Sequence, residues 1–258
     1  MKGPGLKDTA PPFGSLDLDR HAFFFDFDGT LAEIAPRPQD VVLAEPLRLN
    51  LLRLHDLTEG AVAIITGRNR DEILSLLGAE LPVAGLHGLD FPHPPAHPDA
   101  QREPEAARRA RAQAIRPWLG PLGRLVAAHP GTLLEDKGQG LALHWRGAPE
   151  AEPVMLAAAR QVLDALGEGW QLQPGKCVAE IRPAGEDKGS ALRRFLRIPP
   201  FRGRRPVAFG DDLNDLPMLD AAREAGGLAV AMGERDLPAD LRLAGPAALA
   251  EWLERRLG

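Results

Sequence analysis

The chain has 258 residues, and at roughly 150 residues per domain this length predicts one large domain or two modest ones, which excludes a small binding module. Hydrophobic residues make up 44% of the sequence and charged residues 26%, so the chain can bury a core and is not a disordered protein. The formal net charge of −5 argues against binding nucleic acid or anionic lipid through bulk charge. An anionic ligand would therefore need a local cluster of cations.

Cysteine content and the N-terminal segment indicate the compartment. Cys177 is the only cysteine and cannot form an internal disulfide, which is typical of a reducing compartment. We expect it to be a small buried hydrophobic residue. Residues 1–20 hold no apolar run of signal-peptide length, and no stretch approaches the roughly 18 apolar residues that a membrane span needs. These features predict a soluble cytoplasmic protein.

Short apolar runs alternate with helical spacing in the first third of the chain. The runs at 22–27, 61–66 and 82–86 are typical of strands buried on both faces of a sheet. Between them, residues from Pro46 to Gly60 and from 69 to 77 show helical spacing. This order predicts a parallel sheet covered by helices.

The pattern changes after residue 91. Residues 92–98 are rich in proline and indicate a stiff linker, and 102–116 predict a basic amphipathic helix. No aromatic residue is interleaved with its arginines, so we interpret this helix as solvated rather than as a nucleic-acid site. Two hairpins follow, at 133–146 and at 170–182, the second turning through Pro174-Gly175, with a helix between them.

Strand and helix alternation resumes after residue 184 and ends in a helix at 246–257. The sequence therefore predicts an α/β fold with a Rossmann-like parallel-sheet core built from residues 1–91 and 184–258. Residues 92–183 would form a smaller inserted α+β domain.

Two carboxylates, Asp26 and Asp28, stand one residue apart at the end of the first predicted strand. In open α/β sheets, ligands collect at the carboxyl ends of the strands. Alternation along an extended chain sends both side chains to the same side, and Gly29 and Thr30 let the chain turn away. Paired acids there can act as a nucleophile and a proton-transfer group. The alternative is an Asp-rich turn without chemistry.

Three further segments lie at strand ends or helix starts. Thr66-Gly67-Arg68 suits a phosphate oxygen, although Thr66 could instead cap the following helix. Lys188 could neutralise phosphate charge or simply be solvated. The acids Asp211, Asp212 and Asp215 suit a hard cation such as Mg²⁺, although Asp215 could instead cap a helix.

These four segments, in this order, resemble the haloacid dehalogenase superfamily of phosphotransferases. The resemblance implies that Asp26 attacks phosphorus to form an aspartyl phosphate and that Asp28 protonates the leaving oxygen and then activates water. Thr66 and Lys188 would hold phosphoryl oxygens. The implied Mg²⁺ ligands are the Asp26 side chain, the Asp28 backbone carbonyl and the Asp211 side chain, with Asp215 behind them.

Strand parity divides the inserted hairpins into two faces. Leu141, Leu143 and Trp145 share one face, and Cys177, Ala179 and Ile181 share the corresponding face of the last strand. We expect these apolar sets to cover the helices of the insert. The opposite face would be open and polar, suited to sugar hydroxyls and a phosphate or, alternatively, merely solvated; its members are Glu135, Lys137, His144, Arg146, Glu180 and Arg182.

Segments 134–138, 142–146 and 180–189, together with 26–36 and 85–88, are similar to the trehalose-6-phosphate phosphatase family, over about residues 22–256. The similarity implies a small-molecule sugar phosphate as substrate. It assigns substrate contacts to Glu135, Lys137, Arg146 and Glu180, and we add Arg68 to these. We interpret His87 as hinge structure.

One segment departs from that family: Asn214-Asp215-Leu216 stands where Thr-Asp-Glu is usual. Asn-Asp is commoner in related sugar phosphatases, so another glycosyl phosphate, such as sucrose 6-phosphate or a glucosyl- or mannosyl-3-phosphoglycerate, is the alternative substrate. A silent sugar-phosphate sensor is a further alternative, against which the intact set of acids argues. The sequence leaves open whether a trehalose-6-phosphate synthase binds the protein.

Overall fold

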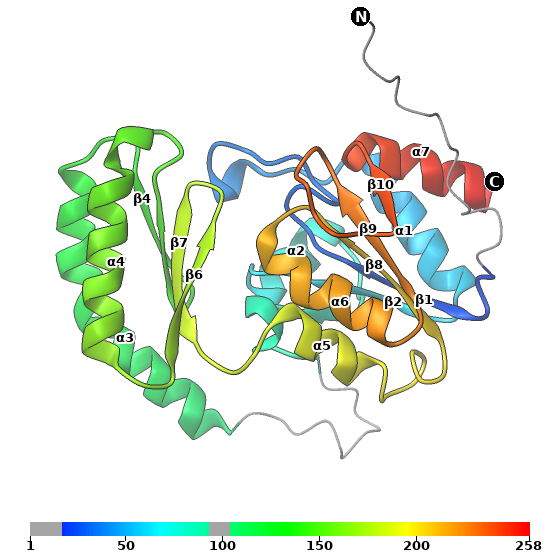
Figure 1. Ribbon diagram of the computed structural model, residues 1–258, viewed down its shortest axis with the longest axis horizontal. Coiled ribbons are helices and arrows are strands. Elements are labelled where there is room, and N and C mark those ends of the chain that lie inside the picture. Colours follow the sequence, from blue (N-terminus) through cyan, green and yellow to red (C-terminus); the bar gives the residue numbers. More distant parts are fainter. Residues whose placement is uncertain (1–16, 93–103) are drawn as a thin grey trace, which may run out of the picture.

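The computed structural model describes residues 17–92 and 104–258. The predicted linker at 92–98 therefore lies almost wholly outside the described residues. Within the described part, two sheets stand apart, each with its own helices (Figure 1).

The larger sheet is parallel and six-stranded, in the order β10-β9-β8-β1-β2-β3. Its strands are β1 (His21–Phe25), β2 (Val62–Ile65), β3 (Val83–Ala84), β8 (Arg205–Gly210), β9 (Leu228–Met232) and β10 (Leu241–Leu243). The central strands β1, β2 and β8 align Phe25 with Ile64 on one side and with Phe209 on the other. This register brings the carboxyl ends of all three to one edge.

Helices cover both faces of this sheet, as the buried apolar runs predict. Phe23 and Phe25 pack on one face against α1 (Glu45–Leu57), α2 (Arg70–Leu77) and α7 (Pro246–Leu257). Ala22 and Phe24 pack on the other face against α5 (Lys188–Phe195) and α6 (Leu216–Glu224). The predicted α/β fold with a parallel-sheet core is confirmed.

The smaller sheet, which we call the cap sheet, is antiparallel in the order β4-β5-β7-β6. Its strands are β4 (Leu133–Asp136), β5 (Leu141–His144), β6 (Trp170–Gly175) and β7 (Val178–Pro183). The helices α3 (Glu105–Ala127) and α4 (Glu152–Leu166) cover its outer face, and its other face is turned toward the core (Figure 1). The predicted parity holds, because Leu141, Leu143, Trp145, Ala179 and Ile181 are buried against these helices.

Several short 3-10 turns complete the described chain. They are η2 (Pro38–Asp40), η3 (Leu86–Gly88), η4 (Pro149–Ala151) and η5 (Leu213–Asp215). Of these, η3 and η5 lie beside the strand ends that carry the predicted motifs.

Three local predictions differ from the structure. The helix predicted to end at residue 116 continues through Pro117 and Pro121, because burial of Ile115 and Leu122 on the cap sheet offsets the cost of interior prolines. The second hairpin turns at Lys176-Cys177 rather than at Pro174-Gly175, since β6 runs to Gly175. Cys177 accordingly lies in a turn with φ of 60° and is only partly buried.

Candidate active site

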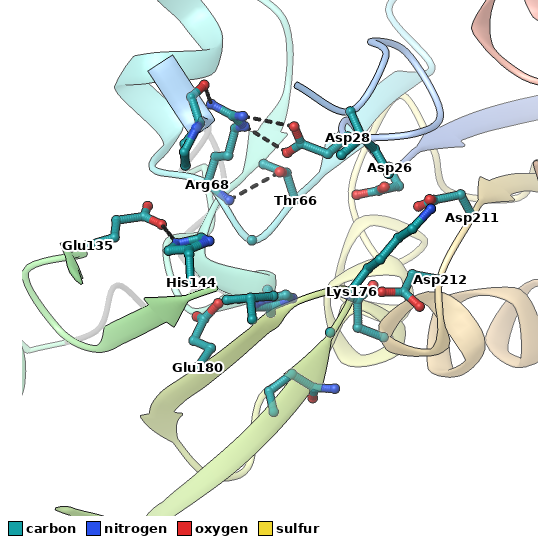
Figure 2. Close-up of a pocket in the computed structure, with 18 of the residues that line it drawn as sticks. Asp26, Asp28, Thr66, Arg68, Glu135, His144, Lys176, Glu180, Asp211 and Asp212 are labelled. Atoms are coloured by element: carbon teal, nitrogen blue, oxygen red, sulfur yellow. Dashed lines mark hydrogen bonds and ion pairs between the residues drawn. The ribbon is translucent and has the colours of Figure 1, made fainter. Parts of the chain in front are cut away.

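One cavity lies between the carboxyl edge of the core sheet and the polar face of the cap sheet (Figure 2). The predicted site residues that line it are Asp26, Asp28, Thr66, Arg68, Glu135, Lys137, Arg146, Glu180, Lys188 and Asp211. Asp215 is the one predicted site residue behind the wall, and it is fully buried. The fold thus brings together residues that are up to 185 positions apart in the chain.

Lys188 joins two carboxylates at the floor of this cavity. It is the first residue of α5, whose N-terminus is fixed by a capping box between Asp187 and Ser190. Its Nζ lies 2.5 Å from Asp26 Oδ1 and 2.6 Å from Asp215 Oδ1, with only 2% of the side chain exposed. The alternative of a solvated lysine is therefore wrong.

The charges at this floor shift one another's pKa values. Burial alone would lower the pKa of Lys188, but the carboxylates of Asp215 and Asp26 raise it above the usual lysine value, so it stays protonated. The pKa of Asp26 is raised, first by burial and then by the negative charge of Asp215. Burial, followed by the charge of Asp215, also raises the pKa of Asp211 to about 7. The site thus concentrates more negative charge than Lys188 alone neutralises.

A metal ion fits this surplus of negative charge. One oxygen from each of Asp26, Asp211 and Asp215 lies within 4.8 Å of the others, a cluster of hard donors that could hold a cation. Gly29, with φ of 87°, is needed here because a Cβ on it would lie 2.2 Å from Asp211 Oδ2. The glycine therefore allows Asp211 to approach the Asp26 loop.

Asp215 supports this cluster through hydrogen bonds to the backbone and to Lys188. Its Oδ2 accepts hydrogen bonds from the backbone N–H groups of Asp211 and Asp212, at 2.9 and 3.0 Å, and its Oδ1 accepts from Lys188. Its side chain makes no capping bond to α6 itself, but with Asp212 it forms the capping box of the turn η5 that leads into α6, so the predicted capping role is found there. Both of its oxygens are engaged, which leaves Asp26 and Asp211 as the acids with free oxygens.

Asp28, beside Asp26, forms a bidentate ion pair with Arg68 (Figure 2). Arg68 Nε and Nη2 donate to the two Asp28 oxygens at 2.7 and 2.8 Å. The guanidinium also donates to the Pro38 carbonyl and to Glu72. Arg68 lines the cavity as predicted, but most of its donors are occupied by the protein itself. The Asp28 side chain is not part of the three-aspartate cluster.

Thr66 directly follows β2 and is 1% exposed at the cavity wall. Its Oγ1 accepts a hydrogen bond from the backbone N–H of Arg68 at 3.1 Å. The helix α2 begins later, at Arg70, with Asn69 as its N-cap, so Thr66 does not cap it. Among the described residues the Thr66 hydroxyl donates to no partner, so it can donate to an acceptor in the cavity.

The cap sheet contributes paired charges to the opposite wall. Glu135 Oε2 lies 2.9 Å from His144 Nε2, and Glu180 Oε2 lies 2.7 Å from Lys137 Nζ. Burial would raise the pKa of Glu180, but Lys137 and then His87 lower it far below the usual range, so the carboxylate is ionised. Arg182 differs from the prediction: it is buried away from the cavity and donates to the Glu186 carbonyl and to Gln173.

Other residues enter the cavity that sequence reasoning did not select. The turn at Lys176 reaches the core, where Figure 2 shows Lys176 on the side of Asp211 and Asp212. Arg146 Nη2 donates to the Lys176 carbonyl at 3.1 Å. Asn214 also lines the cavity, with a buried Oδ1 that has no hydrogen-bond partner among the described residues. The sequence signals turns and a helix start at these positions, but not which of them meet.

Comparison with known proteins identifies the family. The profile of the family described as trehalose-phosphatase matches residues 24–238. The chain belongs to this family. A trehalose-6-phosphate phosphatase of Escherichia coli K12 is 37% identical over 91% of this chain and 86% of its own length. A probable trehalose-phosphate phosphatase of Sinorhizobium fredii is also 37% identical, over 85% of this chain and 80% of its own length.

Solved structures agree on the fold. The C-terminal domain of the C. albicans trehalose-6-phosphate phosphatase superposes with a TM-score of 0.74 at 20% identity, covering 93% of both chains. The protein is therefore a phosphatase of the trehalose-phosphatase family, a hydrolase with the haloacid dehalogenase fold and a cap. Among the described residues, no helix has the length and apolar character needed to cross a membrane.

Proposed function

We propose that this protein is a Mg²⁺-dependent phosphatase that hydrolyses trehalose 6-phosphate to trehalose and phosphate through an aspartyl phosphate on Asp26. The observation that carries the proposal is the shared cavity, which sets a reactive carboxylate and two phosphate-binding groups below a polar, charged cap face. The choice of trehalose as the sugar rests on the names of the relatives. In this division of labour, residues 1–91 and 184–258 perform the chemistry and residues 92–183 recognise the sugar.

The phosphoryl group would lie over Asp26, because Lys188 and Thr66 line the same cavity and offer donors to its oxygens. Lys188 holds Asp26 Oδ1, so the other carboxylate oxygen is the nucleophile. That oxygen attacks phosphorus, the bond from phosphorus to the sugar oxygen breaks, and Asp28 gives its proton to the leaving oxygen. Water then attacks phosphorus, Asp28 takes a proton from it, and Asp26 is released as a carboxylate.

Asp28 must leave its ion pair with Arg68 before these reaction steps can take place. Both of its oxygens accept hydrogen bonds from Arg68, so in this arrangement neither is placed to pass a proton to the leaving oxygen. Proton transfer to the leaving oxygen therefore requires Asp28 to rotate off the guanidinium. Arg68, which lies in the cavity wall, is then free to contact the substrate.

Asp26 and Asp211, with the backbone carbonyl of Asp28, would hold Mg²⁺, and Asp215 would orient Asp211 through its backbone N–H. When bound, the ion would neutralise charge on the phosphoryl oxygens and on the carboxylates. The raised pKa values of Asp26 and Asp211 support this role, since a cation relieves the same repulsion.

The cap residues Glu135, Lys137, Arg146 and Glu180 would bind the sugar hydroxyls. Charged groups of both signs that face a cavity suit hydroxyls, which donate and accept. The partner of the protein is then a small sugar phosphate. Asn214, with its unpartnered oxygen in the wall, is the feature that favours the second candidate, a phosphatase for another glycosyl phosphate.

Trapping the intermediate tests the proposed mechanism. Enzyme mixed with trehalose 6-phosphate and Mg²⁺, then quenched in acid within one turnover, should carry phosphate on the peptide containing Asp26. Asp26→Asn should show none. Turnover by the wild type with no phosphorylated Asp26 peptide at any quench time would overturn the aspartyl-phosphate mechanism.

A further inference from the structure

The segment that follows β3 carries unusual backbone strain beside the cavity. Leu86 and His87 are adjacent non-glycine residues in the left-handed region, with φ of 50° and 56°. Non-glycine residues in this region are strained and persist only where the surroundings hold them. Here Leu86 N–H donates to the Arg68 carbonyl at 3.0 Å, and His87 N–H donates to the Thr66 carbonyl at 2.8 Å.

The strain places the His87 imidazole directly over Gly67. A Cβ on Gly67 would lie 2.6 Å from His87 Nε2, so the glycine gives the ring its room. His87 is only 4% exposed and lines the cavity. The backbone of this residue is thus fixed to the phosphate-binding loop, and its ring points toward the cap.

The ring meets a carboxylate of the cap. His87 Nε2 lies 3.3 Å from Glu180 Oε2, the same oxygen that accepts from Lys137 Nζ at 2.7 Å. Lys137 also donates to the Gly67 carbonyl at 2.8 Å. The other Glu180 oxygen accepts nothing from the part of the chain that the structure describes. Two core groups, His87 and Gly67, therefore fix two cap side chains and leave one carboxylate oxygen available.

Building on the proposed function, we propose that His87 is a positioning residue, a core histidine whose Nε2–H orients the Glu180 carboxylate of the cap toward the sugar of the substrate. Because its backbone bonds to Thr66, His87 ties the position of the sugar-binding carboxylate to the phosphate-binding loop. Burial, opposed by Glu180 and reinforced by Lys188 and Lys137, lowers the pKa of His87 and keeps the ring neutral. With its proton on Nε2, the neutral ring can donate this bond to Glu180.

A double-mutant cycle with a conservative rescue tests the role. His87→Asn suits the left-handed backbone but lacks a donor at the Nε2 position, whereas His87→Gln places an amide there. His87→Asn should lower kcat/KM for trehalose 6-phosphate by about 10- to 100-fold, and His87→Gln should recover most of it. His87→Asn/Glu180→Gln should be no worse than Glu180→Gln alone. His55→Asn, on α1 away from the cavity, is the matched control.

Multiplicative losses in the cycle, or equal losses for His87→Asn and His87→Gln, would overturn the proposal. A second readout needs no substitution at His87: the imidazole Nε2–H resonance should exchange slowly in the wild type and be lost or shifted in Glu180→Gln. An unchanged resonance would overturn the proposal even if His87→Asn failed to fold. A wild type that releases no phosphate from trehalose 6-phosphate would instead refute the proposed function. The Nε2–H resonance would still test the contact between His87 and Glu180 in that case.

Discussion

The ion pair between Lys137 and Glu180 allows a quantitative test of the cap's contacts. The two side chains are 8% and 9% exposed, and their charged atoms lie 2.7 Å apart. Removing one partner of a buried pair leaves an uncompensated charge and typically costs about 3–5 kcal/mol. Lys137→Met should therefore lower the free energy of unfolding by about 3 kcal/mol, the lower end of that range, because His87 still contacts Glu180.

Denaturant unfolding at neutral pH measures this loss, and two variants serve as controls. Lys137→Met/Glu180→Gln removes the stranded charge and should be more stable than Lys137→Met. Arg193→Met breaks an ion pair of the same 2.7 Å length whose members are 47% and 64% exposed, so it should cost at most about 1 kcal/mol. Equal losses for Lys137→Met and Arg193→Met would refute the reasoning from burial.

The same variant separates sugar recognition from chemistry. Losing a hydrogen bond to a charged group costs about 1.5–3 kcal/mol, so kcat/KM for trehalose 6-phosphate should fall roughly 10- to 150-fold in Lys137→Met. Hydrolysis of a small aryl phosphate, which does not reach the cap residues, should fall far less. Assays well below the melting temperature keep the destabilised variant folded. Equal losses on both substrates would mean that Lys137 supports the core site.

Three further outcomes follow from the core and from His87. Asp26→Asn should abolish turnover without changing the melting temperature, and Asp28→Asn should lower kcat by about 10²–10⁴-fold. Near-normal turnover by Asp26→Asn would exclude Asp26 as the nucleophile. EDTA should abolish the activity of the wild type, and added Mg²⁺ should restore that activity. Full activity in EDTA would contradict the proposed role of Asp211 as a Mg²⁺ ligand. The pKa of His87 is lowered in the folded state, so below about pH 6.5 the unfolded chain binds a proton that the folded chain does not. On going from about pH 7.5 to about pH 5.5, the wild type should therefore lose more stability than His87→Asn; equal losses by denaturant unfolding would contradict the lowered pKa.

Much of the fold follows from local sequence patterns. The buried phenylalanine run before Asp26 predicts a strand covered on both faces, and the two-residue alternation from Leu141 onward predicts which face of its strand is buried; the structure shows both. The strand β10, Leu241–Leu243, was not predicted, because it is short and only partly buried at the sheet edge. The extension of α3 through two prolines was also missed, since packing against the cap sheet overrides local propensity.

The site shows the same division between local and tertiary information. Local motifs place Asp26, Thr66 and Lys188 at the ends of elements, and parallel topology brings those ends together. The partner of Arg68 could not be predicted, because Asp28 lies 40 residues away and meets it only through the sheet order. His87 looked like hinge structure because nothing local shows that its ring would meet Glu180, 93 residues later.

Phosphate release from a panel of sugar phosphates tests the central claim most directly. Purified wild type with Mg²⁺ would be assayed for kcat/KM on trehalose 6-phosphate, glucose 6-phosphate, sucrose 6-phosphate and a glucosyl-3-phosphoglycerate, with Asp26→Asn as the blank. The proposed function predicts that trehalose 6-phosphate is preferred by at least about tenfold, since a lone glucose would lose the contacts that the second sugar makes with the polar groups of the cap. A clear preference for the glycerate-linked or sucrose phosphate, or no release above the blank from trehalose 6-phosphate, would contradict it.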